Sequence, residues 1–437
     1  MKYQIREVVD IAHALKKIDP SYTFVWENIG DPIAQNWTVP QFLKDILIEE
    51  IQRQGDKAFG YAHSRGNMDA RQWVAQAVKQ WCPSSSLTED DVLFTSGLGS
   101  AIALLYQMMP DGARVLQPAP GYPTHASLES FAAGSAPLFY RLDPQNGWEP
   151  DLAHMEEQII AHPEITAIVV INPNNPTGAV CSKETLAGIV SLAEKYALMI
   201  ISDEVYFRMI YNGKAHVHMV EAVNSRVPLL VLRGMSKDVP WPGGRCGWIE
   251  FHTMQLDADA QAYAANLKQR VLMEVCSTTL PQTVLPRVYD HPDFGTWIDT
   301  YNTELEKNGN AIAETLSRTR GLTVNRADGA FYMMPLFEDD VLTNTQTLPI
   351  RNADARAFVE KEVNKPGFPL DQRFTYYLLA SVGIVTVPAS GFNAPHAGFR
   401  ITTLERNTAR RDDTYMRLSR AIETYLASSR VSSAQTA

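Results

Sequence analysis

The sequence predicts an α/β protein in which a mostly parallel sheet carries helices on both faces. Between about residues 90 and 250, short apolar runs alternate with stretches of helical periodicity. Runs that are apolar at every position are typical of strands buried on both faces, and their alternation with helices favours a parallel sheet. The length of 437 residues exceeds what one hydrophobic core usually organises. We therefore expect a large sheet-bearing domain and a smaller one.

Periodicity places the elements along the chain. Residues 41–54 are expected to form an amphipathic helix, because apolar side chains recur there at helical spacing and Gly55 follows. Strands are expected at the apolar runs 92–95, 113–116, 167–171, 199–202 and 229–232. A long helix is expected over residues 291–319, and the polar stretch 336–375 is expected to form loops and one helix.

These elements give a predicted domain organisation. Residues 1–50 would form an N-terminal arm and part of the smaller domain, residues 51–319 the large domain, and residues 320–437 the smaller domain. The small polar residues from Ser428 to the end are expected to form a frayed tail.

Composition argues against several classes of protein. The 49 acidic and 39 basic residues give a formal net charge of −10 without long runs, which argues against a nucleic-acid surface. No segment approaches the length of a membrane span, and the N-terminus lacks an apolar signal core, so we expect a cytoplasmic protein without a membrane partner. The four cysteines lie far apart, which indicates neither a zinc site nor a disulfide framework.

Polar residues directly follow several of the expected strands. Asn172 follows the run 167–171, and Asp203 follows 199–202. The segment 234–237, which ends in Lys237, follows the strand expected at 229–232. Ligands of open α/β sheets bind beyond the carboxyl ends of the strands, so these residues are expected to share one site.

The motifs around these residues resemble a known family. Asn-Pro-Asn-Asn-Pro-Thr-Gly (172–178), Asp-Glu-Val-Tyr (203–206) and Arg-Gly-Met-Ser-Lys-Asp (233–238) occur in the order typical of fold type I pyridoxal-phosphate enzymes, specifically the class I/II aminotransferases. The resemblance extends from about residue 27 to residue 402. It implies a large domain with a mostly parallel seven-stranded sheet sandwiched by helices, a smaller α+β domain, and pyridoxal 5'-phosphate as the cofactor.

The resemblance also implies roles for the strand-end residues. Lys237 would hold the cofactor as a Schiff base and then move the proton at the substrate Cα. Asp203 would pair with the pyridine nitrogen and keep it protonated. Tyr206 and Asn175 would donate to the phenolic oxygen of the cofactor.

The phosphate group would lie at a glycine-rich turn that opens a helix after the strand 92–95. Gly97, Leu98 and Gly99 would supply backbone donors at the helix N-terminus, and Ser100 or Ser236 would add a hydroxyl. Such a turn is often only a tight turn when it stands alone. Arg245 matches the family's second phosphate anchor in its spacing from Lys237.

Further residues are assigned by resemblance to the cofactor ring, the substrate and the neighbouring subunit. Tyr122 would stack on the ring. Tyr61 would reach the phosphate of the partner subunit, which implies a homodimer with shared active sites. Arg400 would bind the α-carboxylate of the amino acid and 2-oxo acid substrates bidentately, with Gly30 and the Asn175 amide nearby.

Some residues depart from the family pattern. Gly234 stands where many relatives carry a phosphate-binding serine, and Asp238 follows the lysine, where a carboxylate would repel a phosphate unless it is turned away. His216 and His218 have a spacing compatible with a metal, but two histidines are too few, and no metal is predicted. His125 is a candidate to line the substrate pocket.

The sequence leaves the reaction and the substrate open. Transfer of an amino group from an L-amino acid to a 2-oxo acid is the leading prediction. The alternatives are a lyase or a specialised elimination or cyclisation enzyme on the same fold, and a cofactor-binding regulatory module, which would carry a basic DNA-binding extension that we do not find. No second arginine for a dicarboxylate side chain stands out, and Arg65, Arg71 and Arg270 are candidates only by residue type.

Overall fold

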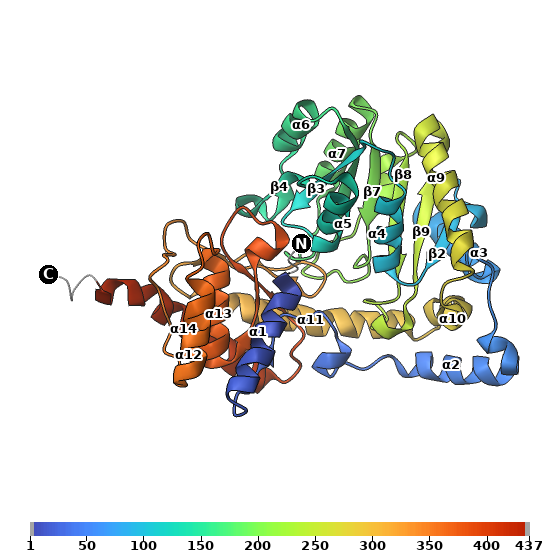
Figure 1. Ribbon diagram of the computed structural model, residues 1–437. Coiled ribbons are helices and arrows are strands. Elements are labelled where there is room, and N and C mark those ends of the chain that lie inside the picture. Colours follow the sequence, from blue (N-terminus) through green and yellow to red (C-terminus); the bar gives the residue numbers. More distant parts are fainter. Residues whose placement is uncertain (1–3, 433–437) are drawn as a thin grey trace.

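The computed structural model describes residues 4–432, and its centre is a β-sheet with helices on both faces (Figure 1). The strands lie in the order β2-β9-β8-β7-β6-β3-β4-β5. Their bounds are β2 (Val92–Thr95), β3 (Arg114–Ala119), β4 (Leu138–Asp143), β5 (Glu149–Pro150), β6 (Ile165–Ile171), β7 (Met199–Asp203), β8 (Leu229–Gly234) and β9 (Gly247–His252). Strands β4, β3, β6, β7 and β8 pair in parallel, whereas β9 is antiparallel to both β8 and β2. The predicted mostly parallel seven-stranded sheet is confirmed, and β5 adds a two-residue antiparallel edge.

The sheet is buried on both faces, as the unbroken apolar runs require. Ile200 and Val231 point into one hydrophobic core, whereas the next residues along the strands, Ile201 and Leu232, point into the other. Helices α4 (Leu98–Gln107), α5 (Pro123–Ala133) and α9 (Ala258–Arg270) cover one face. Helices α3 (Met68–Trp81), α6 (Leu152–Ala161), α7 (Lys183–Lys195) and α8 (Met219–Val223) cover the other.

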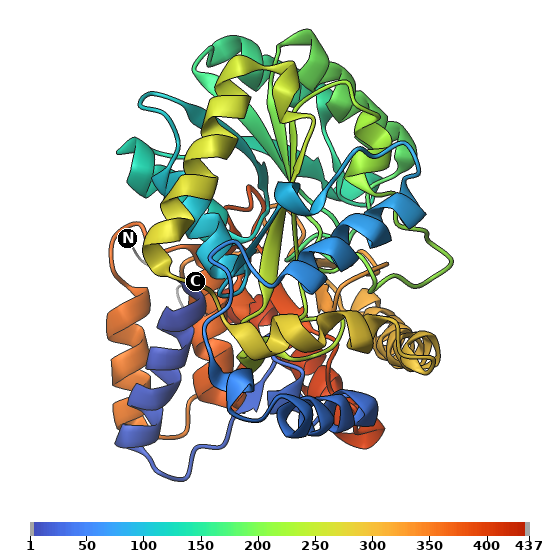
Figure 2. The same ribbon diagram turned by 90° about the vertical axis from the view of Figure 1, so that its right-hand side faces the viewer.

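A second group of elements joins the two ends of the chain. Strand β1 (Val25–Trp26) pairs in parallel with β13 (Ile384–Val385), and α1 (Gln4–Ile18) packs against α13 (Leu370–Val382). The group also contains α12 (Ala353–Val363), α14 (Thr408–Ser432), β10 (Leu322–Thr323), β11 (Tyr332–Met333), β12 (Leu336–Phe337), β14 (Val387–Pro388) and β15 (Phe399–Thr402). Figure 2 shows α1 beside the C-terminal helices, beneath the sheet-bearing half.

Long helices run below the sheet. Helix α11 (Phe294–Ser317) extends from the sheet-bearing half to the group formed by the chain ends, and α2 (Gln41–Gln54) packs along α10 (Thr279–Tyr289) (Figure 1). The predicted helix at 41–54 is therefore confirmed, and α11 lies within the predicted 291–319. The predicted domain boundaries after residues 50 and 319 stay predictions.

The structure corrects some sequence-based expectations. Strands β4 and β9 had no predicted position, and the region 336–375 contains β12, α12 and the start of α13 rather than one helix among loops. Helix α14 continues to Ser432, so residues 428–432 are helical and not frayed, while 433–437 lie outside the described residues. Within residues 4–432, no helix combines the length and apolar character needed to cross a bilayer.

Candidate active site

A cavity of about 350 Å³ lies at the carboxyl ends of β6, β7 and β8. Its lining includes Gly30, Leu98, Gly99, Tyr122, Asn175, Asp203, Tyr206, Ser236, Lys237, Arg245 and Arg400. The structure therefore brings together eleven of the residues predicted for the site from segments that are far apart in the chain. The volume falls in the range of small-molecule sites.

Lys237 reaches into this cavity from the loop after β8. Its Nζ donates a hydrogen bond to the carbonyl oxygen of Gly30 at 3.0 Å and lies 5.3 Å from the centre of the Phe331 ring. Gly30 cannot carry a side chain, since a Cβ there would lie 1.6 Å from the hydroxyl oxygen of Tyr332. The close approach of segment 28–30 to the lysine thus depends on this glycine.

Asp203 is buried at the end of β7. Its Oδ1 accepts a hydrogen bond from the Val205 backbone at 3.2 Å, and its Oδ2 lies 3.4 Å from Nε2 of His125. His125 in turn lies 3.1 Å from the hydroxyl of Tyr106 through Nδ1. The suggestion that His125 lines the substrate pocket is therefore wrong: this residue lies behind the aspartate, fixes its orientation, and does not line the cavity.

Tyr206 stands two residues beyond the buried Glu204, with its ring 6.1 Å from that of Tyr332. Burial raises the pKa of the Tyr206 phenol well above its usual value, and Tyr332 adds to this effect. The phenol therefore remains protonated at neutral pH and can act as a hydrogen-bond donor toward the cavity.

Arg400 projects from β15 and is buried. Its Nη1 donates to Oδ1 of Asn175 at 3.1 Å, its Nη2 donates to the carbonyl oxygen of Asn28, and the Tyr332 ring lies 4.3 Å from the guanidinium carbon. The Nε atom has no partner among the described residues. A buried guanidinium with an unused donor is suited to an anionic ligand, because burial of unpaired donors is otherwise unfavourable.

Asn28 and Tyr332 are among the cavity residues that were not predicted from the sequence. Asn28 lines the cavity with both side-chain polar atoms buried and without partners in the described chain, and Tyr332 covers the guanidinium of Arg400. Asn28 lies at the start of the family resemblance, which begins at about residue 27, and this position is a signal that could have drawn attention to it. No local pattern marks Tyr332.

Residues at the start of α4 form another part of the cavity wall. Gly97 has a φ of 81°, and a Cβ on it would lie 2.5 Å from Nη2 of Arg245, so this arginine packs directly over the glycine. The first turn of a helix leaves its N–H groups without intrahelical acceptors, and those of Leu98 and Gly99 lie at the cavity wall. Ser100 does not line the cavity, and its hydroxyl donates to the Ser96 carbonyl at 3.2 Å, which gives no support to its predicted role.

The comparisons with known proteins agree with this site. The family described as aminotransferase class I and II matches residues 30–411. The chain belongs to this family.

Individual relatives match three quarters or more of the aminotransferase's length. A protein of Methanocaldococcus jannaschii described as an uncharacterized aminotransferase is 39% identical over 426 residues, which is 98% of this chain and 97% of that one. A tyrosine aminotransferase of Dictyostelium discoideum is 30% identical over 76% of this chain and 78% of its own. A solved aminotransferase from Escherichia coli has a TM-score of 0.80 and 26% identity, and covers 97% of this chain and 96% of its own. The aminotransferase therefore has the type I fold and transfers amino groups, and its family is generally dependent on pyridoxal phosphate.

The unusual Asp238 of this aminotransferase is turned away from the cavity. Its carboxylate accepts hydrogen bonds from Tyr289 at 3.0 and 3.1 Å and lies 3.3 Å from Nε of Arg208. Burial raises the pKa of Asp238 to about 6, against the opposing effect of Arg208. These contacts explain how an acidic residue can follow Lys237 without repelling an anion in the site.

Gly234 also has a structural explanation. A Cβ at this position would lie 2.7 Å from the carbonyl oxygen of Cys246 on the chain leading into β9. The close pairing of β8 with β9 therefore leaves no room for the serine that many relatives carry.

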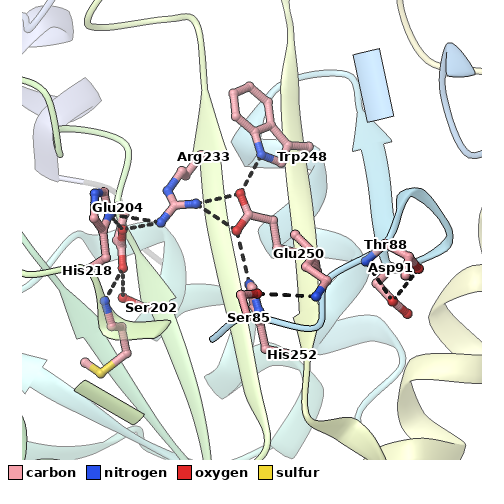
Figure 3. Close-up of polar contacts among 12 residues, drawn as sticks. Ser85, Thr88, Asp91, Ser202, Glu204, His218, Arg233, Trp248, Glu250 and His252 are labelled. Atoms are coloured by element: carbon pink, nitrogen blue, oxygen red, sulfur yellow. Dashed lines mark hydrogen bonds and ion pairs between the residues drawn. The ribbon is translucent and has the colours of Figure 1, made fainter. Parts of the chain in front are cut away.

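A fully buried ion network ties together the strands that support the site (Figure 3). Arg233, near the end of β8, donates to Glu204 at 2.7 Å and to both oxygens of Glu250 at 2.7 Å. Although burial opposes ionisation, the Arg233 guanidinium holds the pKa of Glu204 well below its usual value. Because Glu204 directly follows Asp203 and Arg233 directly precedes Gly234, the network fixes the ends of β7 and β8 relative to each other.

The same network accounts for His216 and His218. Ligand atoms of these histidines and of Glu204 lie within 4.8 Å of one another. However, Arg233 Nη2 already donates to Glu204 Oε2 and lies 3.2 Å from His218 Nδ1. A metal ion would be repelled by this permanent cation, so we assign the histidines to the ion network.

The three arginines named as candidates for a dicarboxylate do not line the cavity. Arg65 and Arg71 lie 3.3 and 3.5 Å from Asp90, and Arg270 lies 3.5 Å from Glu274. Tyr61 also lies outside the cavity lining, and its side chain is 87% exposed.

Proposed function

We propose that the aminotransferase uses pyridoxal 5'-phosphate attached covalently through Lys237, and that it moves an amino group from an L-amino acid to a 2-oxo acid. The observation that carries this proposal is the convergence of Lys237, Asp203, Tyr206 and Arg400 on one cavity. Each of these side chains has the chemistry that one part of the cofactor or substrate requires.

The polar groups of the cavity fit the cofactor. The free N–H groups at the start of α4 and the guanidinium of Arg245 would hold the phosphate, with Ser236 as a hydroxyl donor. Asp203 would accept from the pyridine nitrogen, and Tyr122 would lie against the ring. Tyr206 and the amide nitrogen of Asn175, whose oxygen is already used by Arg400, would donate to the phenolic oxygen. Ser100 is left out of this assignment.

The bound cofactor would supply an electron sink for negative charge that develops at the substrate Cα. Arg400 would bind the α-carboxylate and thereby hold the Cα–H bond in one orientation. Lys237 Nζ would take the proton from Cα as a general base and return it as a general acid. Segment 28–30 links these two residues, because the Asn28 carbonyl accepts from Arg400 and the Gly30 carbonyl accepts from Lys237.

We also propose a homodimer in which Tyr61 completes the partner's site. Large apolar side chains are exposed in two segments, with Phe59 73% exposed beside Tyr61, and Met273 81% exposed. Exposed apolar groups of this kind mark protein interfaces. Mixing inactive Tyr61→Ala and Lys237→Ala variants should restore activity, since each hybrid dimer would contain one intact site. Activity that does not return on subunit exchange would contradict the shared site.

We also propose a cytoplasmic location. Its support is that Cys82, Cys181, Cys246 and Cys276 are all free thiols. Fractionation of the native cells with an antibody against the protein would test it, and recovery outside the cytoplasmic fraction would contradict it.

Replacing the lysine tests the chemistry. The visible absorbance of the wild type loaded with pyridoxal phosphate should bleach when one amino acid is added without an oxo acid, and should return when a 2-oxo acid follows. Lys237→Ala should bind the cofactor without this absorbance and without turnover, whereas Lys183→Ala, an exposed lysine on α7, should behave as the wild type. Full turnover by Lys237→Ala would refute the assignment, and release of ammonia by the wild type would indicate elimination instead of transfer.

A further inference from the structure

The loop that carries Lys237 has few directed contacts from its backbone. Among the described residues 4–432, no backbone–backbone hydrogen bond involves positions 236–239. Met235 and Val239 are buried in the hydrophobic core on either side of the lysine. Apolar burial is not directional, so it keeps the loop in the core without fixing how the loop is turned. A fixed orientation requires a polar partner.

Asp238 supplies that partner. Its side chain is 1% exposed, and its carboxylate accepts hydrogen bonds from the hydroxyl of Tyr289 on α10 at 3.0 and 3.1 Å. The same carboxylate lies 3.3 Å from Nε of Arg208. Burial raises the pKa of Asp238 to about 6, so the carboxylate is ionised at pH 8. Desolvation offsets much of the attraction within a buried ion pair, so a gain in stability alone does not explain this one.

Arg208 connects Asp238 to the loop that carries Tyr206. It stands two residues beyond Tyr206, and its backbone carbonyl accepts a hydrogen bond from Asn302 on α11 at 2.9 Å. Four aromatic rings surround its guanidinium carbon, with centres 4.7 to 5.5 Å away: Trp81, Phe207, Tyr289 and Phe294. Rings at this distance attract a cation. The cage thus holds the guanidinium in place, and the guanidinium holds the carboxylate of Asp238.

We infer that Asp238 and Arg208 are positioning residues, which hold the backbone at Lys237 so that its Nζ points into the cavity beside Tyr206. Nζ lies 5.8 Å from the centre of the Tyr206 ring. Neither member of the ion pair lines the cavity, so the pair acts through its sequence neighbours and does not touch the cofactor. The inference rests on the proposed function, since it takes Lys237 as the residue that binds the cofactor covalently.

Two forms of the cofactor separate positioning from a general effect on the fold. The aldehyde of pyridoxal phosphate condenses with Nζ of Lys237 and releases water, whereas pyridoxamine phosphate has an amine at that position and binds without a covalent bond. When pyridoxal phosphate is added at pH 8 to the full-length chain freed of cofactor, the Schiff base should form about 10- to 100-fold more slowly in Asp238→Asn than in the wild type, because the lysine is no longer aimed at the aldehyde. The dissociation constant of pyridoxamine phosphate, measured by calorimetry, should stay within about twofold.

Further variants test the contacts one at a time. Tyr289→Phe removes only the hydroxyl donor and should slow the same step to a smaller extent. Tyr140→Phe is its control, because it also removes a buried hydroxyl, which donates to the carbonyl of Val169 at 2.9 Å, and it should leave the rate unchanged. Arg208→Lys keeps the charge and should react faster than Arg208→Met. The double variant Asp238→Asn with Arg208→Met should be no slower than the slower single variant, since both changes break the same contact.

The possible outcomes separate this inference from the proposed function. An unchanged rate in Asp238→Asn, or equal rates in Tyr289→Phe and Tyr140→Phe, would overturn the positioning role while the covalent chemistry stands. Equal losses in Schiff-base formation and in pyridoxamine phosphate binding would also overturn it, because they would show a general effect on the fold. A wild type that binds both forms of the cofactor, but shows no adduct at Lys237 by mass spectrometry after borohydride reduction, would overturn the proposed function and the inference with it.

Discussion

The carboxyl group of Glu27 offers a quantitative test of the structure behind Arg400. Glu27 is 1% exposed, and its Oε2 accepts hydrogen bonds from Tyr415 at 2.9 Å and from Thr402 at 3.0 Å. It has no ion-pair partner among the described residues. Burial raises the pKa of Glu27 to about 7, despite these two hydrogen bonds. Glu27→Gln keeps the shape and an acceptor oxygen but cannot ionise.

The size and sign of the effect follow from proton linkage. Relative to an ordinary pKa of 4.5, a pKa of about 7 corresponds to about 3 kcal/mol. The folded state binds this proton more tightly than the unfolded state, so the stabilisation is complete below pH 4.5 and is lost as the pH rises through 7. Glu27→Gln lacks this loss. Its stability relative to the wild type should therefore increase by up to about 3 kcal/mol between pH 4.5 and pH 8.

Thermal unfolding at a series of pH values is the assay. With an unfolding entropy of about 2.1 cal/mol/K per residue, about 3 kcal/mol corresponds to a change in Tm of about 3 °C for this chain. Asp238 titrates in an overlapping range, but its contribution cancels in the difference between variant and wild type. Glu423→Gln, at an exposed position on α14, is the control and should show a flat difference. A difference between Glu27→Gln and wild type that does not change with pH would refute the reasoning.

Three further variants probe the site and its support. Arg400→Lys should raise KM for every amino acid by about 10- to 100-fold, because a lysine ammonium cannot donate the two parallel hydrogen bonds that a guanidinium gives to a carboxylate. An unchanged KM would show that Arg400 does not bind the carboxylate. Gly97→Ala should raise the dissociation constant of the cofactor, because the added Cβ would clash with Arg245. Gly112→Ala is the control, since Gly112 has a similar φ near +80° but open space around it, and it should raise the dissociation constant less. Equal dissociation constants for the two variants would exclude the clash with Arg245. Arg233→Met should lower the free energy of unfolding by about 3–5 kcal/mol, because the buried carboxylates of Glu204 and Glu250 lose their cation. Arg226→Met, which removes an exposed ion pair, should lower it by less than about 1 kcal/mol. Similar values of Tm for the two variants would contradict the buried network.

Much of the sheet and part of the site could be predicted from local patterns. Strand β7 was expected over 199–202 and spans Met199–Asp203, and β6 was expected over 167–171 and spans Ile165–Ile171. Strands that are buried on both faces have apolar residues at successive positions, which makes them recognisable in the sequence. Asn175, Asp203 and Lys237 follow such runs closely, at the end of the sheet where ligands bind. Strand β9 escaped prediction because Glu250 and His252 interrupt its apolar pattern, although both are buried.

Those interruptions make sense only in three dimensions. Glu250 is tolerated in the sheet because Arg233 lies opposite it and both oxygens are hydrogen-bonded, a pairing across neighbouring strands. The orientation of Asp238 away from the cavity likewise depends on Tyr289 and Arg208, which come from other parts of the chain. In each case, the compensation for a buried charge lies at a distance that sequence spacing does not reveal.

Residue order therefore indicated the fold class, the strand ends and the residues whose chemistry is tied to those ends, because burial and strand geometry repeat at short range. Tertiary structure decided which side chains face the same cavity. The contacts of Arg400 with Asn28, of Lys237 with Gly30 and of Arg400 with the ring of Tyr332 all join residues from separate elements that are far apart in the sequence. Such contacts arise only when separate elements pack, and they leave no periodic signal in the sequence.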